Sequence, residues 1–390
     1  MGPTQAVIDR DAIRANLHEI RALLRPGTAL LAVVKANAYG HGCIEAARIL
    51  VAAGADALGV GYIQEGIDLR RAGIQAPVLV MGPTPHDEAE ALLHHRLEPV
   101  LCDLGLAERL SSLASQAGRT VPVHLKVDTG MARLGVSPRE AAAYAAKLAA
   151  LPGIRLEGLM SHFACADAED PGTARDQLAR FLEADRSLQA AGVRAARRHL
   201  ANSAGLLALP EAHLEMVRPG ILLYGYAPTP RLAAGLALRT ALTLRTRIAA
   251  LRDVPRGQGV SYGHTFVAPR DLRVATLPLG YADGLSRALS NRGQVLVHGR
   301  RAPILGRVCM DMTLVDVTSM PGAAVGDEVV LIGRQGAEAI TADEVAAAAG
   351  TISYEILAGI GPRVPRAYVG AAAAGAARGP AASPGSPESR

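Results

Sequence analysis

Apolar and polar positions follow two different patterns along this chain. Up to about residue 225, short apolar runs rich in β-branched residues alternate with alanine-rich segments whose apolar positions have the period of a helix. This rhythm predicts eight βαβ units, with strands at 29–35, 57–61, 77–81, 98–102, 121–127, 156–161, 198–201 and 216–218. Eight successive parallel strands with intervening helices favour a (β/α)8 TIM-like barrel. A doubly wound open sheet is the alternative, but the Gly-x-Gly-x-x-Gly turn that it often carries is absent from the sequence.

After about residue 235, apolar and polar residues alternate one by one. Runs of this kind at 241–248, 294–299 and 328–332 are separated by glycine turns and predict antiparallel strands. We therefore expect an α/β protein with an N-terminal barrel over residues 1–235 and a C-terminal, mostly-β domain over residues 236–370. Residues 371–390 are mostly alanine, glycine, proline and serine, and we expect a disordered tail because they hold nothing to bury.

The composition is that of a globular protein with more than one domain. At 390 residues the chain exceeds the usual size of a single core, and 49% of its residues are hydrophobic while 20% are charged. Its four cysteines form no Cys-x-x-Cys pair, so we expect no disulfide framework and no metal site, but the reduced thiols of a cytoplasmic protein. Residues 1–20 lack the apolar core of a secretory signal, and no stretch is long and apolar enough to span a membrane.

The formal net charge of +5 raises the question of a nucleic-acid partner. The densest basic run, residues 194–199, is the best candidate contact. Only 3% of the residues are aromatic and the chain has no tryptophan, so surfaces on which bases stack are scarce. We therefore interpret the run as a solvated helix face and expect no nucleic-acid partner.

Lys35 is the first candidate for chemistry. The chain has three lysines and 38 arginines, and Lys35 stands at the carboxyl end of the first predicted strand. A guanidinium stays protonated, whereas a buried amine can lose its proton and condense with a carbonyl group. The scarcity of lysine therefore favours a Schiff-base nucleophile. The alternative is a lysine that reaches from the strand end into solvent.

Further polar residues follow the later strands, at the end of the barrel where barrel enzymes carry their reactive groups: Lys126, Arg133, His162, Asn202, Ser203 and Arg218. The loops after strands seven and eight, where barrels often bind phosphate, hold Ser203, Gly220 and Ile221. Tyr39 can reach the same place from the first loop. Singly, these residues are typical of helix caps, turns and packed cores. With Lys35 they indicate a phosphorylated aldehyde cofactor, pyridoxal 5'-phosphate.

Six segments carry recognisable motifs in a fixed order. They are Ala-Val-Val-Lys-Ala-Asn-Ala-Tyr-Gly-His-Gly (32–42), Lys-Val-Asp-Thr-Gly-Met-Ala-Arg-Leu-Gly (126–135), Val-Arg-Pro-Gly-Ile (217–221), Val-Ser-Tyr-Gly (260–263), Gly-Tyr-Ala-Asp-Gly (280–284) and Cys-Met-Asp (309–311). Together they closely resemble the signatures of the alanine racemase family, and the resemblance extends from Ala6 to Tyr368. It implies a pyridoxal-phosphate-dependent isomerase that interconverts L-alanine and D-alanine and supplies D-alanine for peptidoglycan.

The resemblance also implies how two bases are placed. Lys35 would carry the cofactor as an aldimine and act on one face of the substrate. Tyr262 of the partner subunit would act on the opposite face, so that a homodimer shares its active sites. Inversion at a carbon requires bases on opposite faces, because one base that returns its own proton restores the starting configuration. His162, hydrogen-bonded to Arg218, would help Tyr262, since a free tyrosine titrates only near pH 10.

Arg218 separates the racemase from related proteins. By resemblance, its guanidinium would face the pyridine nitrogen as a donor and leave that nitrogen unprotonated, which favours racemisation over transamination. Barrel-type decarboxylases of basic amino acids share the two-domain plan but carry Glu-Pro-Gly-Arg where this chain has Val-Arg-Pro-Gly at 217–220. Single-barrel proteins that only carry the cofactor lack a second domain. The resemblance therefore favours the racemase over the lyase and the carrier.

The remaining roles are implied by resemblance as well. Arg133 would bind the substrate carboxylate, with Lys126 carbamylated and holding Arg133 in place, because carbon dioxide converts that cation into an anion. Met310 would line the pocket from the partner subunit and Tyr281 would narrow the entrance. Tyr354 would contact the phosphate, with Asn202 among the other cofactor-binding residues. The sequence leaves open the substrate breadth, the choice between a biosynthetic and a catabolic role, and the effect of His264, which follows Tyr262-Gly263 where a small residue is frequent.

Overall fold

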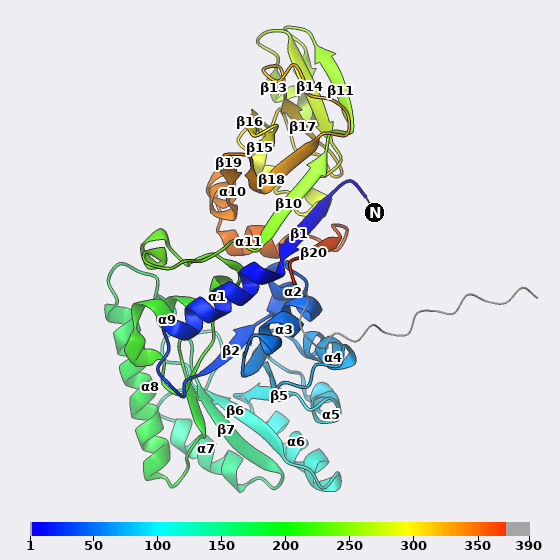
Figure 1. Ribbon diagram of the computed structural model, residues 1–390. Helices are drawn as coiled ribbons and strands as arrows, with labels where there is room; N and C mark the ends of the chain where they lie inside the picture. The colour runs from blue at the N-terminus through cyan, green and yellow to red at the C-terminus, as the bar shows by residue number, and fades with distance from the viewer. Residues whose placement is uncertain (1, 372–390) are drawn as a thin grey trace, which may run out of the picture.

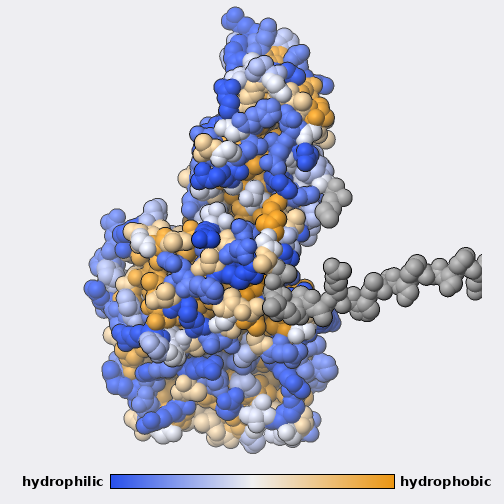
Figure 2. All heavy atoms as spheres, in the orientation of Figure 1, coloured by the Kyte–Doolittle hydropathy of each residue, from blue (hydrophilic) through white to orange (hydrophobic). Residues whose placement is uncertain are grey.

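The computed structural model describes residues 2–371, which form an elongated molecule with a barrel at one end and a narrower second domain at the other (Figure 1). Hydrophilic and apolar residues are interspersed over the visible face of both parts (Figure 2). From residue 372 onward, the predicted tail lies outside the described residues.

Eight parallel strands form the barrel, in the order β8-β7-β6-β5-β4-β3-β2-β9. They are β2 (Ala29–Val33), β3 (Ala57–Val60), β4 (Val78–Val80), β5 (Glu98–Leu101), β6 (Val121–Lys126), β7 (Ile154–Met160), β8 (Arg197–His199) and β9 (Met216–Val217). At the seam, the backbone nitrogen of Arg218 donates to the carbonyl oxygen of Ala201 at 2.9 Å. The predicted (β/α)8 barrel is confirmed, and each strand begins and ends within two residues of its predicted bounds.

Helices cover the outside of the barrel because their alanine-rich sequences bury one stripe each. They are α1 (Arg10–Ala22), α3 (Cys43–Ala52), α4 (Ile63–Arg71), α5 (Ala89–His94), α6 (Leu104–Gln116), α7 (Ala141–Ala150), α8 (Gly172–Ala190) and α9 (Ser203–Ala208). In α1 the buried stripe contains Ile13, Leu17 and Ile20, which recur at helical spacing. The strands inside are buried on both faces, so β4 consists of three buried apolar residues in succession.

The second domain is mostly β, as predicted. Its main sheet has the order β16-β15-β18-β10-β1-β20, with β19 on β18, and a smaller sheet has the order β11-β14-β17. The strands are β1 (Gln5–Asp9), β10 (Leu242–Arg247), β11 (Ala250–Val254), β12 (Gly259–Val260), β13 (Phe266–Val267), β14 (Leu272–Leu277), β15 (Gln294–Val297), β16 (Arg300–Pro303), β17 (Thr313–Asp316), β18 (Glu328–Gln335), β19 (Glu338–Ile340) and β20 (Arg366–Val369). Two helices, α10 (Ala342–Ala349) and α11 (Ser353–Ala358), face the barrel.

β1 precedes the barrel in the chain but lies inside the sheet of the second domain (Figure 1). It pairs antiparallel with β10, with Ile8 opposite Leu242, and parallel with β20. The sequence analysis placed no strand here, because five residues with only Ala6 and Ile8 buried give a weak alternation.

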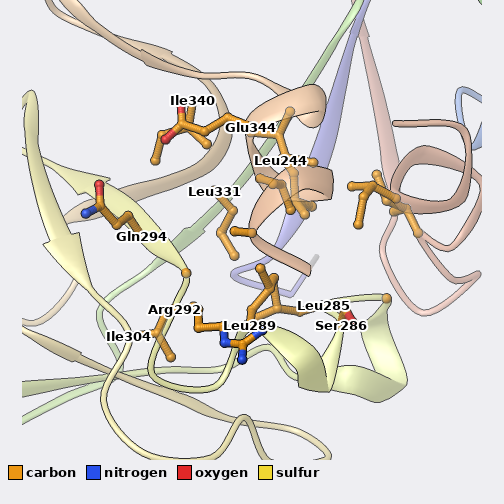
Figure 3. A pocket seen from close by; sticks show the side chains of 17 residues that line it. Leu244, Leu285, Ser286, Leu289, Arg292, Gln294, Ile304, Leu331, Ile340 and Glu344 are labelled. Atoms are coloured by element: carbon orange, nitrogen blue, oxygen red, sulfur yellow. The ribbon is translucent and has the colours of Figure 1, made fainter. Parts of the chain in front are cut away.

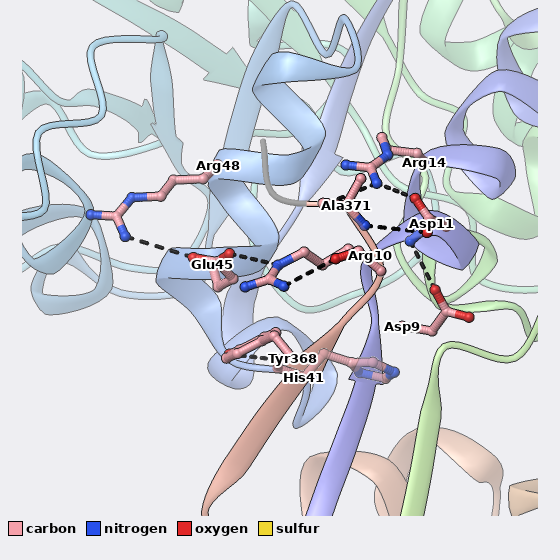
Figure 4. A network of polar contacts seen from close by, with 10 residues as sticks. Asp9, Arg10, Asp11, Arg14, His41, Glu45, Arg48, Tyr368 and Ala371 are labelled. Carbon is pink, nitrogen blue, oxygen red and sulfur yellow. Dashed lines mark hydrogen bonds and ion pairs between the residues drawn. The ribbon is translucent and has the colours of Figure 1, made fainter. Parts of the chain in front are cut away.

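A polar cluster joins the start of α1, α3 and β20 where the two domains meet (Figure 4). Arg10 Nε donates to Glu45 Oε1 at 2.9 Å, and the Arg10 guanidinium lies 5.3 Å from the centroid of the Tyr368 ring. The Tyr368 hydroxyl donates to the carbonyl oxygen of His41 at 3.1 Å. These contacts fix the segment after Lys35 to the start of the barrel and the end of the second domain.

The interpretation of residues 194–199 as a solvated helix face is wrong. α8 ends at Ala190, and Arg197–His199 form β8. Arg198 donates to Glu215 Oε2 at 2.8 Å and to Asp185 Oδ2 at 3.0 Å, so its charge is paired with acids of the barrel. The charge of Arg198 at this strand is thus balanced by acidic residues that lie beside it.

No helix among residues 2–371 is long and apolar enough to cross a membrane. The described residues include no cluster of three or more histidine, cysteine, aspartate or glutamate side chains that could hold a metal ion. Their four cysteines are free thiols.

Candidate active site

A cavity of about 740 Å³ lies at the carboxyl ends of the barrel strands, with α10 and α11 forming its opposite wall. Nine of the residues singled out from the sequence line it: Lys35, Tyr39, Arg133, His162, Asn202, Ser203, Arg218, Gly220 and Tyr354. The fold therefore brings together residues from five barrel loops and one helix of the second domain.

Lys35 begins an unusual turn, α2 (Lys35–Tyr39), directly after β2. The four residues that follow it, Ala36–Tyr39, have φ between 52° and 54°, in the left-handed region. This conformation costs about 1–2 kcal/mol per residue for L-amino acids, so the surroundings must enforce it. Glu65 contributes, because its Oε1 accepts from Ala36 N at 2.6 Å and its Oε2 accepts from Gly61 N at 2.7 Å.

The side chain of Lys35 is exposed to the space of the cavity. The nearby protein nevertheless desolvates the amine and lowers its pKa, and the positive charge of Arg133 lowers it further, while Glu65 opposes this effect. A lowered pKa increases the fraction of neutral amine, which is the form that attacks a carbonyl carbon or accepts a proton.

Arg218 is buried and held by four groups, one of which is the carbonyl oxygen of Leu200 at 3.2 Å from Nη2. Its Nη1 donates to His199 Nδ1 at 2.9 Å, and its Nη2 donates to the carbonyl oxygen of Ser161 at 2.7 Å and to His162 Nδ1 at 3.2 Å. Burial lowers the pKa of Arg218 to about 9, so it remains a cation at neutral pH. This arrangement fixes a positive, donor-only group at the base of the cavity.

His162 is neutral. Burial holds its pKa well below the usual value, and the neighbouring cations Arg218 and Lys126 add to the effect. Because Arg218 can only donate, His162 Nδ1 must accept, and the single ring proton is on Nε2. Asn202 Nδ2 lies 3.5 Å from that Nε2, and because both atoms carry hydrogen no hydrogen bond joins them, which leaves the Nε2 proton free to be donated elsewhere.

Small and polar groups line one side of the cavity, and we call this side the cradle. Its members are Tyr39, Ser203, Gly220 and Tyr354. Gly220 N donates to Ser203 Oγ at 2.9 Å, and a Cβ atom on Gly220 would lie only 2.4 Å from Tyr39 Oη. The rings of Tyr39 and Tyr354 have centroids 6.0 Å apart. Ile221 begins the short helix η3 (Ile221–Tyr224) with its side chain buried, so only its backbone can face the cradle.

Lys126 ends β6 and is buried beside Arg133 and Arg218. Burial and then these two cations lower its pKa to about 8. The loop that follows is shaped by Asp128, whose Oδ1 accepts from the backbone nitrogens of Gly130 at 2.9 Å and Met131 at 2.8 Å. This loop places Arg133 in the wall of the cavity.

Tyr262 and Met310 lie elsewhere in the chain. Both line a different cavity, about 730 Å³, within the second domain. Their exposed fractions are 73% and 52%, and that of Tyr281 is 42%, which is high for large apolar side chains. Within one chain, these three predicted site residues therefore do not line the cavity of Lys35.

The sequence analysis missed His199, which holds Arg218. A signal was present, because a histidine inside a strand that is buried on both faces needs hydrogen-bond partners. It also missed Tyr224, whose hydroxyl donates to the carbonyl oxygen of Val33 at 3.0 Å and whose ring packs on Tyr39 with centroids 5.2 Å apart.

A smaller cavity of about 220 Å³ lies on the far side of α10 and α11 (Figure 3). Val345 and Ile356 line it, whereas Ala346 and Tyr354 of the same two helices line the active-site cavity. The helices thus form one wall between the two spaces.

The sequence matches known proteins along nearly its whole length. Residues 8–228 match the N-terminal domain of alanine racemase, and residues 241–368 match its C-terminal domain. The alanine racemase of Symbiobacterium thermophilum is 50% identical over 372 residues, covering 95% of this chain and 98% of the relative. That of Desulfovibrio desulfuricans is 46% identical over 367 residues, covering 94% and 98%.

Solved structures agree with the sequence matches. The crystal structure of alanine racemase from D-cycloserine-producing Streptomyces lavendulae has a TM-score of 0.90 at 40% identity, covering 95% of this chain and 98% of that one. The alanine racemase of Bacillus anthracis with bound L-Ala-P has a TM-score of 0.89 at 36% identity, covering 95% of each chain.

A parallel barrel joined to a mostly-β domain, together with these matches, defines an isomerase of the amino-acid racemase class. Within that class, the chain belongs to the alanine racemase family. The resemblance inferred from the motifs is confirmed.

Proposed function

We propose that this enzyme interconverts L-alanine and D-alanine with pyridoxal 5'-phosphate as its cofactor. The observation that carries the proposal is the arrangement of one cavity, in which an amine of lowered pKa, a buried donor-only arginine and a glycine cradle face a common space. When bound, pyridoxal 5'-phosphate withdraws electrons and acidifies the α-hydrogen of an amino acid.

The residues present fit this cofactor. Gly220 leaves room where any side chain would collide with Tyr39, and an anion approaching the backbone needs such room. Tyr39, Ser203 and Tyr354 would donate to the phosphate, with the backbone amide of Ile221 and with Asn202 nearby, while Gly220 provides the space and its own amide orients Ser203. Burial raises the pKa of Tyr39 and of Tyr354, so both hydroxyls stay protonated and able to donate.

Lys35 and Arg218 would hold the reactive end of the cofactor. Lys35 Nζ would be joined covalently to its aldehyde carbon and would serve as the base on one face of the substrate once alanine takes its place. Arg218 would face the pyridine nitrogen and, being donor-only, leave it unprotonated. A cofactor held in this way would be a weaker electron sink, which would favour return of the proton to the α-carbon over transamination.

Tyr262 of the partner subunit is proposed as the base on the opposite face. Its exposure of 73% and its separation from the cavity of Lys35 support a homodimer in which each cavity receives Tyr262 and Met310 from the other chain. His162 carries its proton on Nε2, so it can donate to the phenolate oxygen and lower the cost of deprotonating that tyrosine.

Substrate binding would depend on charge pairing and on a narrow pocket. The guanidinium of Arg133 would pair with the substrate carboxylate. A carbamate on Lys126 would place a negative charge beside Arg133 and hold it in position. Met310 and Tyr281 of the partner would restrict the pocket to a small side chain. D-alanine made in this way would supply peptidoglycan synthesis in the cytoplasm.

The test is incubation of the enzyme with pyridoxal phosphate and L-alanine in heavy water, followed by chiral mass analysis. We expect D-alanine that carries one α-deuterium. Release of carbon dioxide instead would show a lyase. Alanine that stays L and unlabelled, with cofactor bound at Lys35, would overturn the proposed substrate.

A further inference from the structure

A continuous chain of hydrogen bonds crosses the barrel interior from its amino end to the active site. Glu98, at the start of β5, lies 3.2 Å from His124 Nε2 on β6. His124 Nδ1 lies 2.8 Å from His199 Nε2 on β8, and His199 Nδ1 accepts from Arg218 at 2.9 Å. The side chain of Glu98 is 18% exposed and that of His124 only 2%, so the chain runs from the barrel's edge into a dry interior.

The two ends fix the direction of every hydrogen bond between them. A guanidinium can only donate and an ionised carboxylate can only accept. His199 Nδ1 must therefore accept from Arg218, which leaves the proton of neutral His199 on Nε2. That proton goes to His124 Nδ1, so His124 in turn carries its proton on Nε2 and donates it to Glu98. Both histidines are held in the Nε2–H form.

The barrel is adapted to hold His124 in this position. Gly158 on β7 lies next to it, and a Cβ atom there would be 2.0 Å from His124 Nδ1. The pairing of β6 with β7 shifts register between Val123 and His124, so that His124 stands opposite Gly158. Burial also keeps His199 neutral, because it lowers its pKa well below the usual value, with Arg218 as the next cause.

We propose that Glu98 and His124 are positioning residues for the reaction, because they favour the same tautomer of His199 that Arg218 requires and so help to keep Arg218 in place. The proposal rests on the proposed role of Arg218 toward the cofactor. With the opposite tautomer, His199 would present an N–H to the Arg218 N–H, and the buried guanidinium would have to move or lose a partner. Neither Glu98 nor His124 lines the active-site cavity, so they act only through Arg218.

The tautomers are tested directly by nitrogen-15 spectra of the imidazole rings in the loaded enzyme, with His124→Phe to assign the signals. We expect both His124 and His199 of the unsubstituted protein to be protonated on Nε2. Glu98→Met removes the acceptor and should produce a mixture of tautomers at both rings. Glu98→Gln keeps an oxygen acceptor and should preserve them. Protonation of His199 on Nδ1, or tautomers unchanged by Glu98→Met, would overturn the proposal.

Alanine turnover gives the second readout. We expect Glu98→Met and His124→Phe each to lower kcat about tenfold, which is the scale of one lost hydrogen bond to a charged group, with little change in KM. The double variant should be no worse than either one, because both act through the same chain of contacts. Glu98→Gln should stay near the unsubstituted rate, and an equal loss in this variant would contradict a role as acceptor.

Glu157→Met is the matched control. Glu157 is a buried carboxylate of β7 that pairs with Arg155 and Arg197 and makes no hydrogen bond to a histidine. It should lower stability without changing the tautomers. If the unsubstituted enzyme does not racemise alanine, the proposed function fails, while the ring spectra still decide between the two tautomers.

Discussion

Gly220 and Tyr39 come from opposite ends of the barrel sequence and meet so closely that a Cβ atom on Gly220 would lie 2.4 Å from the Tyr39 hydroxyl oxygen. The backbone amide of Gly220 meanwhile donates to Ser203. One missing methyl group thus keeps open the side of the cavity proposed for phosphate.

Gly220→Ala should weaken cofactor binding at least about tenfold, because Tyr39 must move away from the cradle. The measurement is a titration with pyridoxal phosphate followed by its absorbance. Gly322→Ala is the control, since a Cβ atom there meets nothing within 4 Å. Equal affinities in the two variants would contradict the placement of the phosphate.

Lys35→Arg should lower the rate of racemisation at least about a thousandfold and should remove covalent attachment of the cofactor. The reason is that a guanidinium keeps the charge but does not condense with an aldehyde. The attachment is measured by mass spectrometry after borohydride reduction. Lys147→Arg, on α7, tests whether a lysine elsewhere matters, and it should leave both attachment and activity unchanged.

Tyr262→Phe should lower racemisation by about 10²–10⁴, the usual contribution of one general acid or base. Lys35 remains, so one enantiomer of alanine should still exchange its α-hydrogen with heavy water while keeping its configuration. Chiral mass analysis follows both events. Loss of exchange in both enantiomers would argue against two separate bases.

Mixing Lys35→Ala and Tyr262→Phe chains tests the shared site. Each variant alone is inactive in a homodimer, but a mixed dimer contains one cavity with both Lys35 and Tyr262. Random reassortment makes half of the dimers mixed, and each mixed dimer has one complete cavity of two. About a quarter of all cavities should therefore be active, which restores about a quarter of the unsubstituted activity. Activity that stays at the level of the single variants would show that each chain builds its cavity alone.

Carbamylation of Lys126 should increase with pH. Carbon dioxide reacts with the neutral amine, and the pKa of Lys126 is lowered from 10.5 to about 8, so the neutral fraction rises steeply below pH 8, is about one half at pH 8 and levels off about one pH unit higher. The carbamate is detected by carbon-13 spectra in labelled bicarbonate. Lys126→Met should abolish that signal and raise the KM for alanine, whereas Lys147→Met should change neither.

The barrel was predictable because most of its strands are apolar runs, and such runs record burial on both faces; β8, which consists of Arg197, Arg198 and His199, is the exception. β1 was not, since Ala6 and Ile8 alone mark its buried side. Chemistry in loops was predictable where the residue type is rare, as with Lys35. The left-handed turn after Lys35 was hidden, because alanine and asparagine carry no signal for four successive positive φ values. The role of His199 was not predicted, because the sequence does not show that its side chain lies beside Arg218.

The pairing of Ile8 with Leu242 sets an order on cotranslational folding. β1 leaves the ribosome before any barrel strand, yet its two neighbours in the sheet are made only after the whole barrel. The nascent chain must therefore keep this short strand unpaired while eight parallel strands close beside it, and its brevity and low apolar content limit the risk that it joins the wrong sheet. Although β1 is made before the barrel, it is thus one of the last strands to reach its place in a sheet.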